Sequence, residues 1–426
     1  MWLYSTRDPS ERATFSEAVL RGAPRSGGLY QPSAFPALEG VDAWLDLPLV
    51  ERSAALCRLW LGDALPGEAL DEVVASTLTF PCPLVEVAPD RFVLELFHGP
   101  TLAFKDFGAR FMARILGELV SRGLTDGPIT ILTATSGDTG AAVAHAFYRV
   151  PGVNVAVLYP KGRISPLQER LFCCLGENVR TFRVDGSFDD CQAMVKGAFT
   201  DPALVRRLGL TSANSINISR LVAQTFYYFE AAAQAPRGRP LTVSVPSGNF
   251  GDLTAGLFAQ RMGLPVQRLL AASNANDVVP AFLAGGPYAP RASVATISNA
   301  MDVGAPSNWE RIRALFQGDD DRLRAALTGG AVSDARTRET MRRLHQDHGY
   351  VADPHTAVAW AVMEDALRPG EVGISLSTAH PAKFVEVVEE TLGISIPLPP
   401  ELAAVADATL MSEDLPADLG ALKARL

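Results

Sequence analysis

Residues 92–107 read FVLELFHGPTLAFKDF, and the rest of the chain is organised around this stretch. It begins as a short apolar run, breaks at Gly99-Pro100 and restarts at Phe107 with helical spacing. From there apolar residues recur every three to four positions, which predicts one buried face of an amphipathic helix. The members of this face are Phe107, Phe111, Met112, Ile115, Leu116 and Leu119. We therefore expect Lys105 just before this helix or within its first turn.

A lysine at the start of a helix lies in an unfavourable field, because the helix N-terminus carries partial positive charge. This field and the flanking apolar residues Leu102, Phe104 and Phe107 are expected to lower the pKa of Lys105. A partly neutral lysine is a nucleophile, as a lysine that forms a Schiff base must be. The alternative is a solvated side chain, which is the usual state of a lysine near a helix start.

Length and composition limit the class of protein. A chain of 426 residues with 48% hydrophobic and 20% charged residues is expected to form two or three compact domains. The net charge of −9 argues against a nucleic-acid binder, because no basic surplus neutralises phosphates. We expect neither a signal peptide nor a membrane span, since no apolar run is long enough. The five cysteines follow no metal or disulfide spacing, which predicts a cytoplasmic location and no metal site.

The pattern of the chain changes at about residue 92. In residues 1–91, short helical patterns are separated by Gly- and Pro-rich turns, which predicts a small, mainly helical N-terminal region. From residue 92 onward, apolar runs alternate with loops and helical patterns, as in βα units with parallel strands buried on both faces. The expected fold class is α/β, with open, mostly parallel sheets in two domains, residues 92–225 and 226–426. Ligands of such sheets bind at the carboxyl ends of the strands.

A loop with two glycines, Ser247-Gly248-Asn249-Phe250-Gly251-Asp252, joins a predicted strand to a predicted helix. Successive backbone N–H groups of such a turn point at one anion, and the helix N-terminus behind them assists. A phosphate is the expected ligand. The spacing is neither that of a P-loop nor that of the dinucleotide fingerprint. The alternative is that the glycines serve only to turn the chain.

A second loop of this kind, Thr135-Ser136-Gly137-Asp138-Thr139-Gly140, carries hydroxyls in place of bulky side chains. Its backbone N–H groups and hydroxyls suit a carboxylate or a phosphate. The alternative is ordinary helix capping by Ser136 or Asp138. Two such loops, each after a buried strand, favour a pair of anion sites.

Two further polar segments complete the candidate site. The segment 212–220 combines asparagine, serine and arginine, and Arg220 is able to bind two oxygens of a phosphate or carboxylate. The alternative there is a loop with a serine N-cap. In the segment 377–383, a neutral hydroxyl at a strand end suits a ring nitrogen, whereas His380 is expected to be structural. Asp353-Pro354 is explained by capping at a helix start.

Several of these motifs, in register over nearly the whole chain, resemble bacterial threonine synthase. This family consists of pyridoxal-5′-phosphate (PLP) enzymes with the tryptophan-synthase β-like fold, also called fold type II. The motifs that carry the resemblance are residues 98–107, Thr135–Gly140, Pro246–Asp252 and Ser377–Phe384, together with Tyr4–Arg7 and Asp353–Ala359.

The resemblance implies a role for each candidate residue. Lys105 would hold PLP as a Schiff base, and Thr378 would face the pyridine nitrogen. The cofactor phosphate would lie on Gly248, Asn249, Phe250, Gly251 and Asp252. The substrate carboxylate would bind at Thr135, Ser136, Asp138 and Thr139, and the substrate phosphate at Asn214, Ser215 and Arg220. Many relatives of this fold carry asparagine in place of Asp138, and a carboxylate there would repel the substrate carboxylate and the PLP phenolate. Asn217 is therefore a candidate to replace Asp138 as the contact of the PLP 3′-oxygen, and the sequence leaves both residues open for this role.

The implied reaction converts O-phospho-L-homoserine and water to L-threonine and phosphate, the last step of threonine biosynthesis. The nearest alternatives share the cofactor and eliminate without adding water: a threonine-synthase-like phospholyase or a serine/threonine dehydratase. A catalytically inactive binding protein is a more remote alternative, and the intact lysine and loops argue against it. The expected partner is the small-molecule substrate, with no nucleic acid and no membrane, and the expected assembly is a monomer or homodimer.

Overall fold

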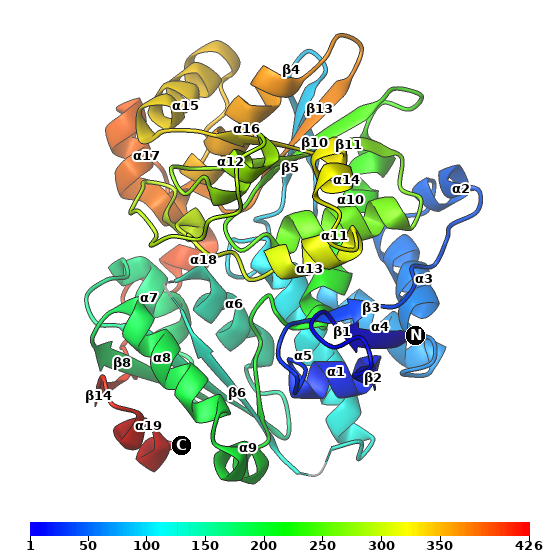
Figure 1. The fold of residues 1–426 in the computed structure, drawn as a ribbon. Helices are drawn as coiled ribbons and strands as arrows, with labels where there is room; N and C mark the ends of the chain where they lie inside the picture. Colours follow the sequence, from blue (N-terminus) through cyan, green and yellow to red (C-terminus); the bar gives the residue numbers. More distant parts are fainter. Residues whose placement is uncertain (126, 136) are drawn as a thin grey trace.

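The computed structural model describes residues 1–125, 127–135 and 137–426. Two mostly parallel sheets form the two halves of the molecule, and a small antiparallel sheet lies near the N-terminus (Figure 1). Helices pack on both large sheets. The predicted α/β class with open, mostly parallel sheets is therefore confirmed.

The smaller of the two large sheets has five strands in the order β14-β8-β7-β6-β9, and every neighbouring pair is parallel. Its strands are β6 (Ile129–Ala134), β7 (Val153–Pro160), β8 (Val179–Asp185), β9 (Leu210–Thr211) and β14 (Glu413–Pro416). The helices of this half are α6 (Asp138–Phe147), α7 (Pro166–Cys173), α8 (Phe188–Phe199), α9 (Pro202–Leu208) and α19 (Leu419–Arg425). All six residues of β6 are buried, as expected for an apolar parallel strand covered on both faces.

The larger sheet has six strands in the order β12-β11-β10-β13-β5-β4, and only the edge pair β4–β5 is antiparallel. Its strands are β4 (Leu84–Ala88), β5 (Arg91–Glu95), β10 (Leu241–Pro246), β11 (Val266–Ser273), β12 (Leu327–Ala331) and β13 (Val372–Ser377). The helices of this half are α11 (Gly251–Arg261), α12 (Val278–Leu283), α13 (Trp309–Leu315), α14 (Asp320–Ala326), α15 (Asp334–His348), α16 (Pro354–Ala366), α17 (Val385–Leu392) and α18 (Pro400–Ala403). The central strands β10 and β13 are buried throughout.

Two long helices connect the halves. Helix α5 (Lys105–Ser121) leads from β5 of the larger sheet to β6 of the smaller one, and α10 (Ile218–Gln234) leads back to β10. They pack together through edge-to-face aromatic pairs, with ring centroids 5.8 Å apart for Phe111 and Phe226 and 5.2 Å apart for Phe107 and Tyr227. The predicted amphipathic helix is confirmed as α5, and Lys105 is its first residue.

The sheets do not follow the domain boundaries expected from the sequence. The boundary between residues 91 and 92 falls inside β5, which pairs with β4 in the larger sheet. The C-terminal strand β14 pairs with β8 of the smaller sheet, although it lies at the far end of the expected 226–426 domain. Helix α10 runs through the boundary at 225. These differences arise because strand pairing joins segments that are distant in the sequence.

The N-terminal region contains the helices α1 (Phe15–Arg21), α2 (Val41–Leu45), α3 (Leu49–Leu61) and α4 (Gly67–Thr77). It also contains an antiparallel sheet that the helical patterns did not indicate, formed by β1 (Trp2–Ser5), β2 (Arg12–Thr14) and β3 (Tyr30–Pro32). These strands are too short for a clear alternating pattern. Among the residues that the structure describes, no helix combines the length and the apolar character needed to cross a membrane.

Candidate active site

A cavity of about 1940 Å³ lies where the loops at the carboxyl ends of the strands of both large sheets meet. Most of the candidate residues line it, namely Lys105, Thr135, Asp138, Thr139, Asn214, Ser215, Arg220, Gly248, Asn249, Phe250, Gly251, Asp252 and Thr378. Ser136 lies outside the described residues. The fold therefore brings together four loops that are up to about 270 residues apart in the sequence, as expected for parallel sheets.

Lys105 is held at the edge of the cavity by the turn that precedes it. Its side chain is 18% exposed. Leu102 adopts left-handed backbone angles, with φ 57°, and the N–H of Phe104 donates to the carbonyl of Thr378 at 2.9 Å. The buried carboxylate of Asp106 accepts from the N–H of Thr101 at 2.8 Å and from its hydroxyl at 2.6 Å. The turn is thus fixed on both sides of the lysine.

The surroundings of Lys105 favour a neutral amine. Burial lowers its pKa, the Asp138 carboxylate opposes this effect, and the cations of Lys383 and Arg220 lower the pKa further. The direction agrees with the prediction from the sequence. Its cause is chiefly desolvation, to which the neighbouring cations add.

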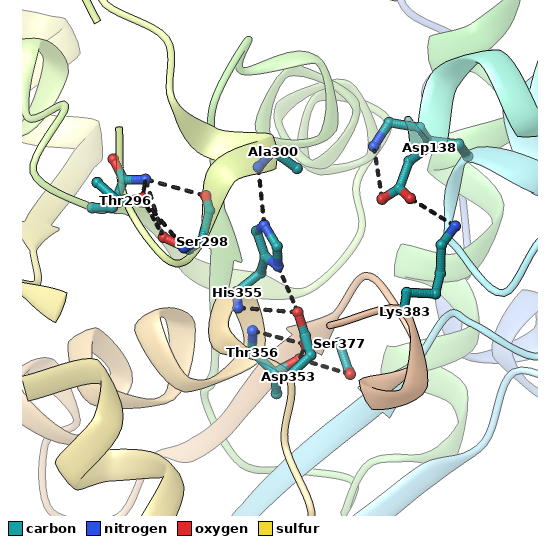
Figure 2. A network of polar contacts seen from close by, with 11 residues as sticks. Asp138, Thr296, Ser298, Ala300, Asp353, His355, Thr356, Ser377 and Lys383 are labelled. Carbon is teal, nitrogen blue, oxygen red and sulfur yellow. Dashed lines mark hydrogen bonds and ion pairs between the residues drawn. The ribbon is translucent and has the colours of Figure 1, made fainter. Parts of the chain in front are cut away.

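Asp138 is not an isolated anion. It is the first residue of α6, and its Oδ2 lies 3.8 Å from Lys105 Nζ. Its Oδ1 lies 2.7 Å from Nζ of Lys383, whose side chain is completely buried (Figure 2). Burial raises the pKa of Asp138, but the two lysines outweigh burial and hold it at about 2. Sequence reasoning missed Lys383, although it belongs to a motif already singled out.

The expected role of Asn217 is wrong. This residue is completely buried and caps α10, where its Oδ1 accepts from the N–H of Ser219 at 3.2 Å and from its hydroxyl at 2.8 Å. Its Nδ2 donates to the carbonyls of Val19 at 2.9 Å and Ser212 at 3.2 Å. Its amide is therefore fully occupied by protein groups and has nothing left for a ligand.

The loop 247–252 has the geometry of an anion cradle. Phe250 adopts left-handed backbone angles, with φ 61°, and α11 begins at Gly251. The first N–H groups of a helix have no partner within the helix, so those at the start of α11 are available to an anion. A Cβ at Gly248 would lie 2.9 Å from the carbonyl oxygen of Ala300 and 2.9 Å from the Cα of Met301. Only glycine fits this position without a shift.

The side chain of Asp252 is used within the protein. Its Oδ1 accepts hydrogen bonds from the hydroxyls of Tyr227 at 2.6 Å and Tyr228 at 2.9 Å. Burial raises the pKa of Asp252 to about 6, against the lowering effect of the two hydroxyls. The carboxylate is thereby fixed against α10, and only the backbone N–H of Asp252 is suited to an anion.

In the segment 214–220, several polar side chains make hydrogen bonds within the protein. Asn214 lines the cavity, and its Oδ1 accepts from the hydroxyl of Thr133 at 2.7 Å. Ser215 Oγ accepts from Nδ2 of Asn308 at 3.2 Å. Arg220 is 3% exposed, and it donates to the carbonyl of Ala213 at 2.5 Å. Its Nε has no hydrogen-bond partner among the described residues, and burial lowers its pKa to about 10, so it remains a cation.

A buried arginine that the sequence did not single out lies beneath these anion loops. Arg311 is completely buried and donates to the carbonyls of Tyr30 at 2.9 Å and Ile216 at 2.8 Å and to Oδ1 of Asn308 at 2.5 Å. The N–H of Asn308 in turn donates to the carbonyl of Asn249 at 3.2 Å. Burial lowers the pKa of Arg311 to about 9, which still leaves a cation near neutral pH. Arg311 thus links β3, the 214–220 segment and the 247–252 loop.

The loop 135–140 is closed by its own hydroxyl. Thr135 Oγ1 accepts from the N–H groups of Gly137 at 3.0 Å and Gly140 at 2.8 Å. Thr139 follows Asp138 in the first turn of α6. The Thr135 hydroxyl therefore shapes the loop, and the helix start behind it remains suited to an anion.

At the opposite wall, Thr378 follows β13 and is 7% exposed. Nearby, the Nδ1 of His355 lies 2.6 Å from Oδ2 of Asp353, and its Nε2 accepts from the N–H of Ala300 at 3.2 Å (Figure 2). This pattern places the proton of a neutral imidazole on Nδ1. Asp353 also caps α16 through the N–H of Thr356 at 3.1 Å, which confirms the capping interpretation. His355 lines the cavity as well, a position that the sequence did not indicate.

Comparison with known proteins gives concordant results. The family described as pyridoxal-phosphate dependent enzyme matches residues 82–377, threonine synthase N terminus matches residues 2–78, and threonine synthase, C-terminal, matches residues 356–425. Threonine synthase of Escherichia coli (strain K12) is 54% identical over 427 residues, covering 99% of this chain and 98% of the relative. The crystal structure of the Escherichia coli threonine synthase has a TM-score of 0.93 at 53% identity, covering 100% of this chain and 99% of the other. The PLP-bound threonine synthase from Brucella melitensis also has a TM-score of 0.93, at 34% identity over 100% and 98% of the two chains.

Proposed function

The chain belongs to the threonine synthase family of pyridoxal-phosphate dependent enzymes, and from this premise we propose the substrate and the role of each residue in its cavity. The proposed reaction converts O-phospho-L-homoserine and water to L-threonine and phosphate. The observation that carries this proposal is the position of Lys105, whose amine faces one cavity together with two anion-binding loops.

The residues present fit PLP. Lys105 offers an amine to the cavity, and the backbone of Gly248–Gly251 lines the same cavity just before the start of α11. We assign the cofactor phosphate to the N–H groups of Asn249, Phe250, Gly251 and Asp252. When bound, PLP supplies an electron sink for the negative charge that develops on the substrate carbons. The hydroxyl of Thr378 is assigned to the ring nitrogen, which it can hydrogen-bond without giving up a full proton.

Lys105 is the proposed base. Its amine, whose pKa is lowered by burial and neighbouring cations, is suited to remove the Cα proton of the substrate, later a Cβ proton, and to return a proton to Cα. The nearest anion, Asp138, is paired with Lys383, so it does not compete as a base.

We assign the two anionic groups of the substrate to two different segments of the cavity lining. The substrate phosphate is assigned to Arg220, Asn214 and Ser215, because a dianionic leaving group needs a cation where charge builds up. The buried Arg311 beneath this segment adds positive potential. The substrate carboxylate is assigned to the start of α6, at Thr135, Asp138 and Thr139, with Ser136 retained as a prediction. Pairing with Lys383 supports Asp138 in this position, because it cancels the negative charge.

Two measurements test the proposal. The purified protein should have a visible absorption band that borohydride removes, and the reduced peptide should carry the cofactor on Lys105. With O-phospho-L-homoserine the products should be threonine and phosphate. Formation of 2-oxobutanoate in place of threonine would assign the protein to the phospholyases or dehydratases instead. A label on another lysine would contradict the role of Lys105.

We also infer a cytoplasmic location and a monomeric or homodimeric state. The five cysteines are all free thiols, which supports a reducing compartment. Sedimentation equilibrium of the purified protein tests the assembly.

A further inference from the structure

One lysine beside the cavity enters the mechanism above only as the partner of Asp138. The side chain of Lys383 is 0% exposed, and its ammonium donates to the carbonyl of Thr101 at 2.8 Å. A buried ammonium is costly unless it is paired. Its partner is Asp138, whose Oδ1 lies 2.7 Å away (Figure 2).

The same carboxylate also faces Lys105. Asp138 Oδ2 lies 3.8 Å from Lys105 Nζ, so one anion lies between two lysines. Lys383 therefore contacts two segments. It binds the turn that carries Lys105 through the carbonyl of Thr101, and it binds the start of α6 through Asp138. A lone aspartate here would hold Lys105 in its charged form and would repel a substrate carboxylate. The position of Lys383 removes both effects.

We propose that Lys383 is a positioning residue that cancels the charge of Asp138, so that this carboxylate faces Lys105 and the substrate as a hydrogen-bond acceptor within a neutral pair. The consequence for chemistry rests on the proposed role of Lys105, whereas the electrostatic coupling itself does not. Removal of Lys383 should raise the affinity of Lys105 for its proton, and removal of Asp138 should lower it.

Other charged groups also face this cluster. Lys105 is influenced by Arg220 and Asp252, and Asp138 by His355. These groups are unchanged in every variant proposed below. Differences between variants therefore report the coupling among Lys105, Asp138 and Lys383.

The test measures the proton affinity of Lys105 directly in the full-length chain freed of cofactor. The rate at which acetic anhydride acetylates Lys105 is followed by peptide mass spectrometry as a function of pH, and its midpoint is compared among four proteins. These are the wild type, Lys383→Met, Asp138→Asn and the double variant. We expect the midpoint to rise by roughly 1 to 2 pH units in Lys383→Met, to fall in Asp138→Asn, and to return near the wild-type value in the double variant.

The design stays informative if Lys383→Met fails to fold. In that case the midpoint must be higher in the double variant than in Asp138→Asn, because these two proteins differ only at Lys383. A midpoint that Lys383→Met leaves unchanged in both backgrounds would overturn the proposal, because it would reduce Lys383 to a packing residue. Lys423→Met is the matched control, since Lys423 pairs with Asp201 at 2.7 Å on α19 of the smaller half and should not move the midpoint.

In the holoenzyme, the same cycle should appear in the kinetics. Lys383→Met should raise KM for the phosphorylated substrate at least tenfold, and adding Asp138→Asn should recover most of that loss. The acetylation midpoints of the four proteins can follow the prediction while their activities do not. The electrostatic coupling then stands, and the role of Lys105 in the reaction is wrong. The acetylation midpoints can instead depart from the prediction while Lys105 still carries the cofactor. The proposed function then stands, and the role of Lys383 is wrong.

Discussion

Gly248→Ala is a direct perturbation of the anion cradle. The new Cβ would lie 2.9 Å from both the Ala300 oxygen and the Met301 Cα, and 3.3 Å from a methyl of Val303. Ordinary contacts between carbon atoms begin at about 3.5 Å, so the loop or the 300–303 segment must move by about 0.6 Å. The two nearest atoms belong to the backbone, so no flexible side chain can absorb this shift.

The expected cost is that of overpacking, about 1–3 kcal/mol. If the loop moves, the N–H groups no longer converge on the phosphate, and PLP affinity should fall by about 5- to 150-fold. If the loop keeps its position, the same strain should appear as lower thermal stability. The dissociation constant for PLP is measured by absorbance titration of the cofactor-free chain, and the melting temperature by circular dichroism.

Gly117→Ala is the control for the same substitution. Gly117 lies inside α5, where a Cβ would lie 3.5 Å from a methyl of Val150, an ordinary contact. It should leave PLP affinity unchanged and stabilise the protein by about 0.5–1 kcal/mol, because alanine is the better helix former. If Gly248→Ala changes neither PLP affinity nor melting temperature, the proposed cradle is wrong.

Three further predictions concern charged residues of the cavity. Lys105→Ala should abolish turnover yet leave a folded chain with unchanged far-ultraviolet circular dichroism, because Asp138 keeps its pairing with Lys383; residual turnover above one-hundredth of the wild type would contradict its role. Arg220→Lys keeps the charge but loses the planar fork, so steady-state kinetics should show KM for the phosphorylated substrate at least tenfold higher with PLP affinity nearly unchanged; an equal loss of both would place Arg220 at the cofactor instead. The pKa of Asp252 is about 6 in the folded protein and near 3.8 in the unfolded chain. The folded state therefore loses stability as pH rises from about 4 to 6, because the unfolded carboxyl ionises more readily. Asp252→Asn should therefore gain up to about 3 kcal/mol relative to the wild type between pH 4 and pH 7 in denaturant unfolding, and parallel pH profiles of the two proteins would contradict this.

The sequence predicted those features that depend on nearby residues. The helix that begins at Lys105 and the loop around Gly248 each carry their signal within about a dozen positions, as apolar spacing or as glycines after a buried strand. Because parallel strands end at one edge, these loops were also expected to meet in one cavity, as they do. The predicted fold class followed from the same alternation of strands and helices.

The remaining features depend on partners far along the chain. Lys383 and Arg311 acquire their roles from contacts with Asp138 and Tyr30, and nothing in the flanking residues marks either contact. The error at Asn217 has a similar cause, because the same residue type suits a ligand contact and a helix N-cap equally well. Only the three-dimensional arrangement distinguishes the two.

The return of β14 to the smaller sheet affects how the protein folds during synthesis. Strand β8 gains its outer neighbour only when residues 413–416 have been made, about 230 residues after β8 itself. Until these residues have emerged from the ribosome, β8 is an exposed strand edge, open to pairing with other nascent chains. Deletion of β14 and of the helix α19 that follows it should therefore promote aggregation of newly made chains.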